Sequence, residues 1–249
     1  MRSGTGRLGG PLVHLDVVGS TNDRARELAI GGAPHGTVVI AERQTAGRGR
    51  QGRTWSAPPG RALTLSAVVR IDAGGFDLLP LAVALAVCEA CERAADVRCE
   101  IKWPNDVWIG GRKAAGILIE ARPQEGWAIL GIGINVDTAS EELEGDLHAT
   151  ATSLRIASGG GVSREVVLDA LFDRLAAWLE QLDRAERVIS AYRERDALYG
   201  QRIAWTQGER RMTGEARGVD DDGTLVVFTG ETEPVRLDAG EVHLEPRRG

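Results

Sequence analysis

The residues whose chemistry stands out first lie within residues 41–55, in the stretch AERQTAGRGRQGRTW. Three glycines alternate there with three arginines: Gly47, Arg48, Gly49, Arg50, Gly52 and Arg53. Glycine lets a backbone approach a ligand closely, and arginine presents a planar, permanently charged fork to carboxylate or phosphate oxygens. The stretch therefore predicts a flexible loop that closes over an anion. Trp55 ends it with an aromatic face that can stack on a flat ring.

The composition of this loop has two plainer interpretations. It is also typical of a solvated basic turn, and of an RNA-binding segment rich in arginine and glycine. The stretch alone leaves both open, so the rest of the chain has to decide between them.

A second cluster, Ser20-Thr21-Asn22, lies at the start of a predicted helix that runs to about Ile30 and stops at Gly31-Gly32. Small hydroxyl and amide side chains are typical of a helix N-cap. That is the interpretation favoured for this cluster in isolation.

A third cluster, Lys102-Trp103-Pro104-Asn105-Asp106, follows a short strand predicted over residues 97–102. Pro104 fixes a turn and ends the strand pairing, so Lys102 lies at a strand end, where a side chain can project into a cleft. Asn105 and Asp106 add amide and carboxylate oxygens. A Pro-Asn turn beside a surface lysine is the simpler alternative.

A fourth cluster joins Lys113-Ala114-Ala115-Gly116 to Gly131-Ile132-Gly133-Ile134-Asn135. Glycine weakens a strand, so two glycines inside a strand predicted over residues 127–136 suggest that a ligand lies against the backbone. The alternative is that Lys113 is a solvated residue at a hairpin end and that the glycines only permit sheet packing.

Apolar patterns predict the elements that position these clusters. Strands are expected over residues 12–18, 37–40, 62–71, 107–109 and 115–121, the last two as a hairpin across Gly110-Gly111. Helices are expected over residues 78–95, 163–182 and 184–198, and residues 141–161 are expected to be mostly loop. Beyond Gly200 the pattern changes to short strands over residues 202–206, 211–219, 224–228 and 234–237. The chain is therefore predicted to be an α+β domain followed by a small β-barrel.

Composition narrows the class of protein. The 249 residues are 43% hydrophobic and 27% charged, which is typical of a soluble globular protein, and the net charge is −6. A broad electrostatic grip on nucleic acid is not expected from such a chain. The pattern predicts no membrane span, and the glycine-rich start, residues 1–11, lacks the apolar core of a signal peptide. Cys88, Cys91 and Cys99 are interpreted as reduced packing residues of a cytoplasmic protein, with a metal site as the alternative.

The clusters become specific when taken in order. Ser-Thr-Asn, Gln-Thr-Ala-Gly-Arg-Gly-Arg, Lys-Trp-Pro-Asn-Asp, Lys-Ala-Ala-Gly-Ile-Leu-Ile-Glu and Gly-Ile-Gly-Ile-Asn together resemble biotin–protein ligase, from about residue 13 to the end. The resemblance implies a mixed β-sheet catalytic domain of the class II aminoacyl-tRNA synthetase and biotin ligase type over residues 1–199. It implies an SH3-like β-barrel over residues 200–249.

The sequence departs from the family pattern in two places. Many relatives have a further basic residue where Gln51 stands, which leaves the loop chemistry in place but can alter its affinity for ligand. Some relatives also carry an N-terminal helix-turn-helix domain and act as repressors. Only about ten residues precede the first predicted strand here, so we expect the ligase without the repressor.

The activity that the resemblance implies is ATP-dependent attachment of biotin to a lysine of a biotin carboxyl carrier domain, in an acetyl-CoA, acyl-CoA or pyruvate carboxylase. Biotin's carboxylate attacks the α-phosphate of ATP, with Mg²⁺ assisting, and gives biotinyl-5′-AMP and pyrophosphate. The carrier lysine then displaces AMP. We expect no DNA or membrane partner, a monomer or weak homodimer, and no assignable protein ligand for Mg²⁺.

The resemblance also implies residue roles. Biotin is expected to contact Ser20, Thr21, Asn22, Gln44, Gly47, Arg48, Gly49, Arg50, Lys113, Gly116, Gly131 and Gly133. The nucleotide is expected to contact Arg48, Arg50, Arg53, Trp55, Lys102, Asn105, Asp106 and Asn135. The catalytic groups are Lys102 on the α-phosphate, Lys113 on the carboxylate, and Arg48 and Arg50 on the adenylate phosphate. The loop is expected to be mobile when empty and ordered by its anion, so that closure excludes water from the intermediate.

Three rival hypotheses remain. Lipoate–protein ligases and octanoyltransferases share the fold and use similar carriers, but the glycine–arginine loop and Lys-Trp-Pro-Asn-Asp favour biotin. A nucleic-acid-binding module is disfavoured by the net charge of −6 and by the lack of an aromatic-lined basic face. The presence of both Lys102 and Lys113 disfavours a catalytically inactive binding protein.

Overall fold

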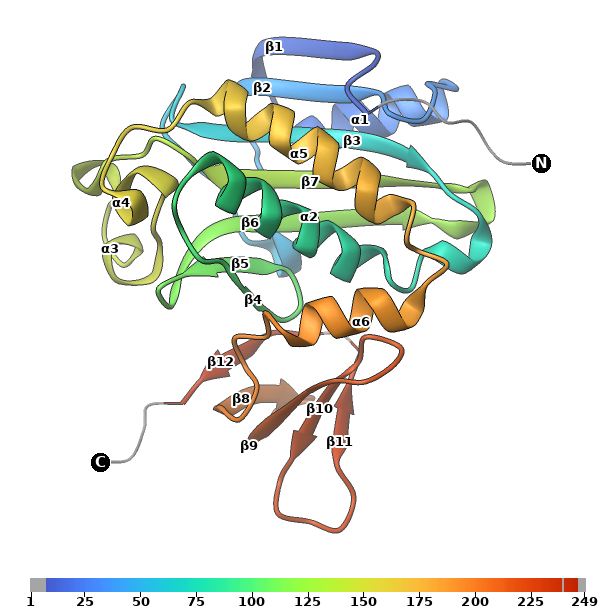
Figure 1. Cartoon of the computed structure of the whole chain (residues 1–249), viewed down its shortest axis with the longest axis vertical. Coiled ribbons are helices and arrows are strands. Elements are labelled where there is room, and N and C mark those ends of the chain that lie inside the picture. Colours follow the sequence, from blue (N-terminus) through green and yellow to red (C-terminus); the bar gives the residue numbers. More distant parts are fainter. Residues whose placement is uncertain (1–7, 239, 246–249) are drawn as a thin grey trace.

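The computed structural model describes residues 8–238 and 240–245, and a seven-stranded mixed sheet forms the centre of its larger part (Figure 1). In spatial order the strands are β1 (Leu12–Val18), β2 (Val38–Gln44), β3 (Ala62–Arg70), β7 (Trp127–Asn135), β6 (Arg112–Arg122), β5 (Asp106–Ile109) and β4 (Glu100–Lys102). β1 and β2 are parallel, and the other neighbours pair antiparallel. This is the mixed sheet that the sequence predicted.

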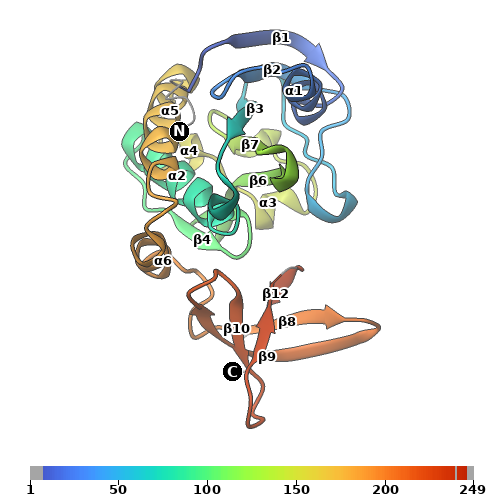
Figure 2. The same ribbon diagram turned by 90° about the vertical axis from the view of Figure 1, so that its right-hand side faces the viewer.

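Helices cover both faces of this sheet. α2 (Leu79–Ala94) and α5 (Arg164–Leu179) pack together on one face, and α1 (Thr21–Ile30) lies on the other (Figure 2). All nine residues of the central strand β7 are buried, because side chains on either face of a doubly covered strand meet protein rather than water. The site described below lies on the α1 face.

The C-terminal part forms a separate antiparallel sheet of five strands (Figure 2). Its spatial order is β11 (Val235–Leu237), β10 (Leu225–Phe228), β9 (Arg210–Val219), β8 (Arg202–Gln207) and β12 (Val242–Leu244). β12 was not predicted, since it has only three residues and follows a polar segment. The boundary predicted at Gly200 stays a prediction, and the last predicted barrel residues, 246–249, lie outside the described chain, as does most of the glycine-rich start.

Several predicted elements differ from the observed ones in length. The segment over residues 141–161, predicted mostly as loop, contains the short helices α3 (Leu147–Thr150) and α4 (Leu154–Ser158). Ser153 starts α4: its hydroxyl accepts a hydrogen bond from the Ile156 N–H at 3.1 Å and donates one to the Thr138 carbonyl at 2.6 Å. A buried serine with both functions is a local signal that the sequence-based prediction missed.

The helix predicted over residues 184–198 was too long. The observed helix α6 (Ala185–Arg193) ends early because the chain then runs beside β4. Ile101 N–H donates to the Arg195 carbonyl at 2.7 Å, and Ala197 N–H donates to the Ile101 carbonyl at 2.9 Å. The strand predicted over residues 97–102 likewise shortens to β4. Long-range pairing, which local propensity does not record, fixes both ends.

The three cysteines are buried free thiols, as expected for packing residues. Within the described part of the chain, no helix is long and apolar enough to cross a membrane.

The junction between the two sheets buries a carboxyl group. Asp196 follows α6, and its Oδ1 accepts a hydrogen bond from the Leu198 N–H at 2.8 Å. Its Oδ2 is buried and has no hydrogen-bond partner among the described residues. A Cβ on Gly218, in β9, would lie 3.6 Å from that oxygen. Burial raises the pKa of Asp196 from its usual 3.8 to about 6, since a carboxylate with one unpaired oxygen is poorly solvated there.

This shift makes stability depend on pH. The folded state binds the Asp196 proton more tightly than the unfolded chain, so the contribution of this group is full below pH 3.8 and is lost as pH rises through about 6. Across that window it amounts to about 3 kcal/mol. We predict that Asp196→Asn, which keeps the acceptor for Leu198 but cannot ionise, removes this part of the pH dependence. Urea unfolding between pH 4.5 and 8 samples about 2 kcal/mol of this contribution.

Asp16→Asn, at an exposed position of β1, is the matched control. It should leave the pH dependence of the free energy of unfolding unchanged. An Asp196→Asn variant whose pH dependence equalled that of the wild type would contradict the assignment.

Candidate active site

A cleft opens on the α1 face of the large sheet, where several separate segments of the chain converge. Counting its open mouth, it has a volume of about 900 Å³. It is bordered by the start of α1, the glycine–arginine loop, the β4–β5 turn, the middle of β6 and β7, and residues 240–242 of the C-terminal sheet. Every residue predicted for the site lines this cleft except Gly47 and Asn135. The sequence clusters therefore meet in one place.

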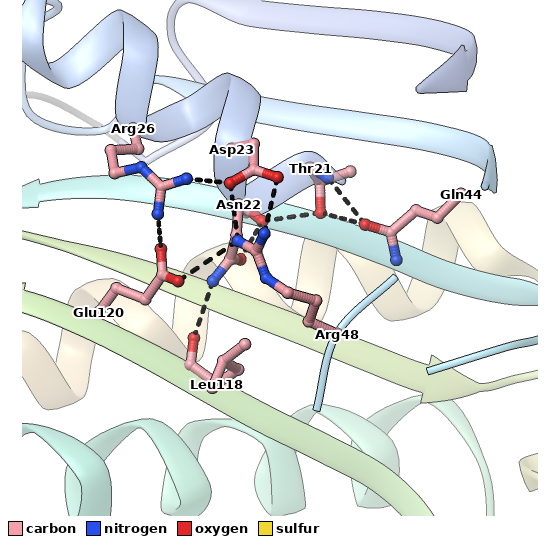
Figure 3. Close-up of polar contacts among 9 residues, drawn as sticks. Thr21, Asn22, Asp23, Arg26, Gln44, Arg48, Leu118 and Glu120 are labelled. Carbon is pink, nitrogen blue, oxygen red and sulfur yellow. Dashed lines mark hydrogen bonds and ion pairs between the residues drawn. The ribbon is translucent and has the colours of Figure 1, made fainter. Parts of the chain in front are cut away.

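The inner end of the cleft is a buried polar network at the start of α1 (Figure 3). Gln44 Oε1 accepts hydrogen bonds from the Thr21 N–H at 2.7 Å and from the Thr21 hydroxyl at 3.0 Å. Ser20 occupies the N-cap position, but its hydroxyl makes no capping hydrogen bond. The capping interpretation thus holds for its position only, and the polar side chains serve the cleft.

Ser66 completes this network and was missed by the sequence analysis. Its hydroxyl lies 2.8 Å from Thr21 Oγ1 and 2.6 Å from Asn22 Oδ1, and the residue is fully buried in β3. The two hydroxyl residues inside the otherwise apolar run ALTLSAVVR, Thr64 and Ser66, are the signal that could have found it. A buried polar side chain needs hydrogen-bond partners, and here the partners are the predicted pocket residues.

The two glycines of β7 make room for side chains of the protein itself. A Cβ on Gly131 would lie 2.1 Å from Asn22 Oδ1, and one on Gly133 would lie 2.3 Å from the Trp55 ring. Gly116, on β6, also lies beneath Trp55, and a Cβ there would be 3.2 Å from the indole ring. The sequence predicted a ligand against this backbone. What approaches it most closely is an amide and an indole, which then form the wall of the cleft.

Trp55 lies inside the cleft, beneath the loop that precedes it. Its Nε1 is buried and has no hydrogen-bond partner within the described residues, which leaves a donor available at the wall. Lys113 Nζ lies 5.9 Å from the centroid of its ring. The indole therefore lies between Gly116 and Gly133 of the sheet on one side and the charged end of the cleft, at Lys113, on the other.

That charged end is dominated by cations around one carboxylate. Lys113 Nζ lies 2.6 Å from Asp106 Oδ1. Burial lowers the pKa of Lys102, which the Asp106 charge partly offsets. Burial likewise lowers the pKa of half-buried Arg50, and the same carboxylate opposes the shift. Three cations share one acidic partner, so an added anion would relieve the mutual repulsion and the incomplete solvation of the cations.

Arg48 does not belong to this group of cations. Its guanidinium forms two hydrogen bonds with Asp23, at 2.7 and 2.8 Å, and lies 3.4 Å from Glu120 (Figure 3). We expected Arg48 to hold a phosphate. In the structure its charge is paired with the carboxylates of Asp23 on α1 and Glu120 on β6, and the expected phosphate contact stays a prediction.

The C-terminal sheet also borders the cleft, which the sequence analysis did not predict. Glu241 forms an ion pair with Arg53 of the loop, and Gly240 and Val242 line the same wall. Burial and the nearby charge of Lys102 lower the pKa of His243, with Arg53 and Arg211 adding to the effect. Pairing between residues 188 positions apart has no signature in local sequence.

Three predicted residues serve the framework. The Asn135 amide donates to the Thr152 carbonyl at 3.0 Å and does not line the cleft, and its expected nucleotide contact stays a prediction. Gly47 is also outside: a Cβ there would lie 2.4 Å from the Trp55 carbonyl oxygen, so the glycine allows the loop to close on itself. Asn105 lines the cleft, but its amide donates to the Ile117 carbonyl at 2.8 Å and holds the turn against β6.

Gln51, where the family pattern has a basic residue, has a φ of 54°. This left-handed conformation is unfavourable for a side chain other than glycine, so the loop stores some strain at its tip. Among the described residues there is no group of three His, Cys, Asp or Glu side chains that could hold a metal ion.

Comparison with known proteins agrees with this geometry. Residues 15–137 match the model of the Biotin/lipoate A/B protein ligase family, and residues 199–244 match that of the Biotin protein ligase C terminal domain. A bifunctional ligase/repressor BirA of Bacillus spizizenii is 36% identical over 90% of this chain and 71% of its own length. A biotin–[acetyl-CoA-carboxylase] ligase of Mycobacterium tuberculosis is 37% identical over 92% of this chain and 89% of its own.

Solved structures give the same result. The biotin protein ligase of Aquifex aeolicus, in complex with biotin and ATP, superimposes with a TM-score of 0.81 at 29% identity, over 95% of this chain and 99% of that one. Sequence relatives, both family models and the fold agree, and the chain belongs to the biotin protein ligase family.

Proposed function

We propose that this protein attaches biotin to a lysine of a carrier domain in a biotin-dependent carboxylase, by way of biotinyl-5′-AMP. One observation carries the proposal. A neutral hydrogen-bonding end, made by Thr21, Asn22 and Gln44, and a cationic end, made by Arg50, Lys102 and Lys113, share one cleft, and buried Ser66 supports the neutral end from behind. That polarity matches a ligand with an uncharged polar head and a carboxylate tail.

The neutral end suits the ureido group of biotin. That group offers N–H donors and one carbonyl acceptor, and buried hydroxyls and amides can satisfy both. Asn22 is held over Gly131 with its Oδ1 near Ser66 and its Nδ2 3.4 Å from the Leu118 carbonyl. An acid without a ureido group would leave these polar groups unpaired, which is how such a site discriminates against it.

The cationic end suits the activation of a carboxylate by ATP. A carboxylate oxygen of biotin bonds to the α-phosphorus, the bond from that phosphorus to the bridging oxygen breaks, and pyrophosphate leaves. Lys113, oriented by Asp106, contacts the carboxylate, and Lys102 with Arg50 stabilises charge on the α-phosphate. Cations preorganised in a water-poor site stabilise such charge more than they would in water.

Transfer then needs mainly positioning. The uncharged ε-nitrogen of the carrier lysine bonds to the acyl carbon, the acyl–oxygen bond breaks, AMP leaves, and the amine loses its proton to water. Holding amine and adenylate in register can contribute about 7–11 kcal/mol. Mg²⁺ is proposed to accompany ATP. Such an ion is held largely by phosphate oxygens and water rather than by a protein cage.

The direct test is mass spectrometry of an apo carrier domain incubated with this protein, ATP, Mg²⁺ and biotin. We expect a mass gain of one biotin that requires ATP and disappears when the carrier lysine is changed to arginine. Transfer of lipoate or octanoate, with none of biotin, would contradict the proposal and assign the protein to the related acid ligases.

Retention of the intermediate tests the role of Arg50. We predict that Arg50→Gly releases biotinyl-AMP at least about tenfold faster, equivalent to about 1.4 kcal/mol of lost binding, because it removes a charge-assisted contact to the phosphate. Release of the radiolabelled adenylate from the protein, measured by rapid gel filtration, gives the rate.

Gln51→Gly is the matched control for that variant. It adds the same flexibility one residue along the loop, keeps Arg50, and relieves the left-handed φ of 54°. If both variants release the adenylate equally fast, loop flexibility rather than the arginine charge is the cause, and the assigned role is wrong.

The contact between Asn22 and the sheet generates another prediction. Gly131→Ala places a methyl group 2.1 Å from the present position of Asn22 Oδ1, so the amide has to move away from the pocket. We expect the KM for biotin to rise at least about tenfold while the KM for ATP changes little. Gly160→Ala, where a Cβ meets nothing within 4 Å, is the control. Equal KM values for biotin in the two variants would contradict the placement of Asn22.

A further inference from the structure

Four charged side chains form a closed ring beside the cleft (Figure 3). Arg48 of the loop bonds both oxygens of Asp23, at 2.7 and 2.8 Å, and lies 3.4 Å from Glu120 Oε1. Arg26 bridges the same two acids, through an ion pair with Asp23 and a contact of 3.1 Å to Glu120 Oε2. Two cations and two anions from α1, β6 and the loop thus satisfy one another.

The ring differs from an ordinary surface ion pair. Arg48 is 39% exposed, and a single pair at that exposure would contribute little. Here the contact to Asp23 is bidentate, which fixes the plane of the guanidinium, and both acids have a second cation as partner. The hydrogen bonds from Arg48 keep the pKa of Asp23 below its usual range, so the carboxylate stays ionised near neutral pH.

The position of Arg48 in the loop lets the ring restrain the whole loop. Arg48 pairs with Thr54 as an antiparallel bridge, Gly49 N–H donates to the Arg53 carbonyl at 2.7 Å, and Trp55 N–H donates to the Gly47 carbonyl at 3.0 Å. The two sides of the loop are therefore hydrogen-bonded to each other, as in a short hairpin. Fixing Arg48 on one side fixes Trp55, next to Thr54, on the other, and Trp55 is the wall over Gly133.

We propose that Asp23 and Glu120 are positioning residues that hold the loop over the cleft through Arg48, and that Arg48 is an anchor rather than an anion-binding residue. Arg50, half-buried beside Asp106, is then the loop arginine that contacts the anion. Because Asp23 directly follows Asn22, one turn of α1 carries both a pocket amide and the loop anchor. The anchoring itself is independent of the activity, and only its kinetic consequence rests on the proposed function.

The first test needs no catalytic activity. In the ligand-free protein, trypsin cleavage after Arg50 and Arg53, followed by mass spectrometry, reports how often the loop opens. We expect Asp23→Asn and Glu120→Gln each to accelerate this cleavage at least about fivefold, and Asp16→Asn, an exposed neutralisation on β1, to leave it at the wild-type rate. Glu120 lies on a strand, so agreement between the two variants excludes a helix-end effect of Asp23. If trypsin cleaved the Asp23→Asn and Glu120→Gln variants no faster than the Asp16→Asn control, the proposal would be wrong.

The second test separates anchoring from contact with substrate. Asp23→Asn should raise the KM for biotin severalfold while kcat at saturating biotin stays within about twofold of wild type, and Asp23→Glu should restore much of the KM. If Arg48 acts through Asp23, Asp23→Asn/Arg48→Gln is no worse than the more impaired single variant. If the two increases in the KM for biotin multiply in the double variant, Arg48 does not act through Asp23 and the proposal is wrong. Failure of the proposed function would appear separately, as absence of biotin transfer by the wild type.

Discussion

The site depends on the absence of side chains at two positions on one face of a central strand. β7 is buried along its whole length, and any Cβ at Gly131 or Gly133 would collide with Asn22 or Trp55. Those two glycines let an amide from α1 and an indole from the loop lie directly against the sheet. The cleft is therefore made by removing volume from a strand that is otherwise packed with isoleucine and leucine. A glycine in such a strand costs stability, and the polar network around Ser66 and Thr21 offsets part of that cost by pairing the buried groups.

Charge is distributed over the cleft in two different ways. At the Lys102–Lys113 end, the loss of hydration destabilises the charged form of Lys102 more than the charge of Asp106 stabilises it, so the pKa of Lys102 is lowered. Around Arg48, two acids and two cations balance. Two arginines only two residues apart thus have opposite environments. A bound anion would stabilise the unbalanced end, whereas the balanced ring has no unpaired charge to offer it. Residue type alone therefore does not assign the same function to Arg48 and Arg50.

Local sequence was a good guide wherever the structure is decided locally. The apolar runs predicted the strands of the large sheet and the helix at residues 21–30, and nearly all the site residues that the chemical motifs named do line the cleft. Ser66, Glu241 and the partners of Arg48 were beyond reach, because each depends on pairing between segments that are distant in sequence. The glycines of β7 were correctly taken as sites of close approach, but what approaches them is protein, and only the three-dimensional packing reveals that. The early end of α6 has the same origin, since the Ile101 pairing competes with helix propensity there.

The loop is the point at which these separate parts of the chain become one site. Arg48 joins it to α1 and β6, and Arg53 joins it to Glu241 beside β12 of the C-terminal sheet. The Arg53 end has a single carboxylate partner and is 57% exposed, whereas the Arg48 end has two partners and is 39% exposed. Screening by water and salt weakens the more exposed pair more, so the contact with the C-terminal sheet is the weaker of the two. Opening of the cleft at that end would disturb neither Asn22 nor the Gln44 network, because both are attached to the strands and to α1 rather than to the loop. The same fold can thus keep a fixed neutral pocket while the charged end admits a nucleotide and, later, a lysine.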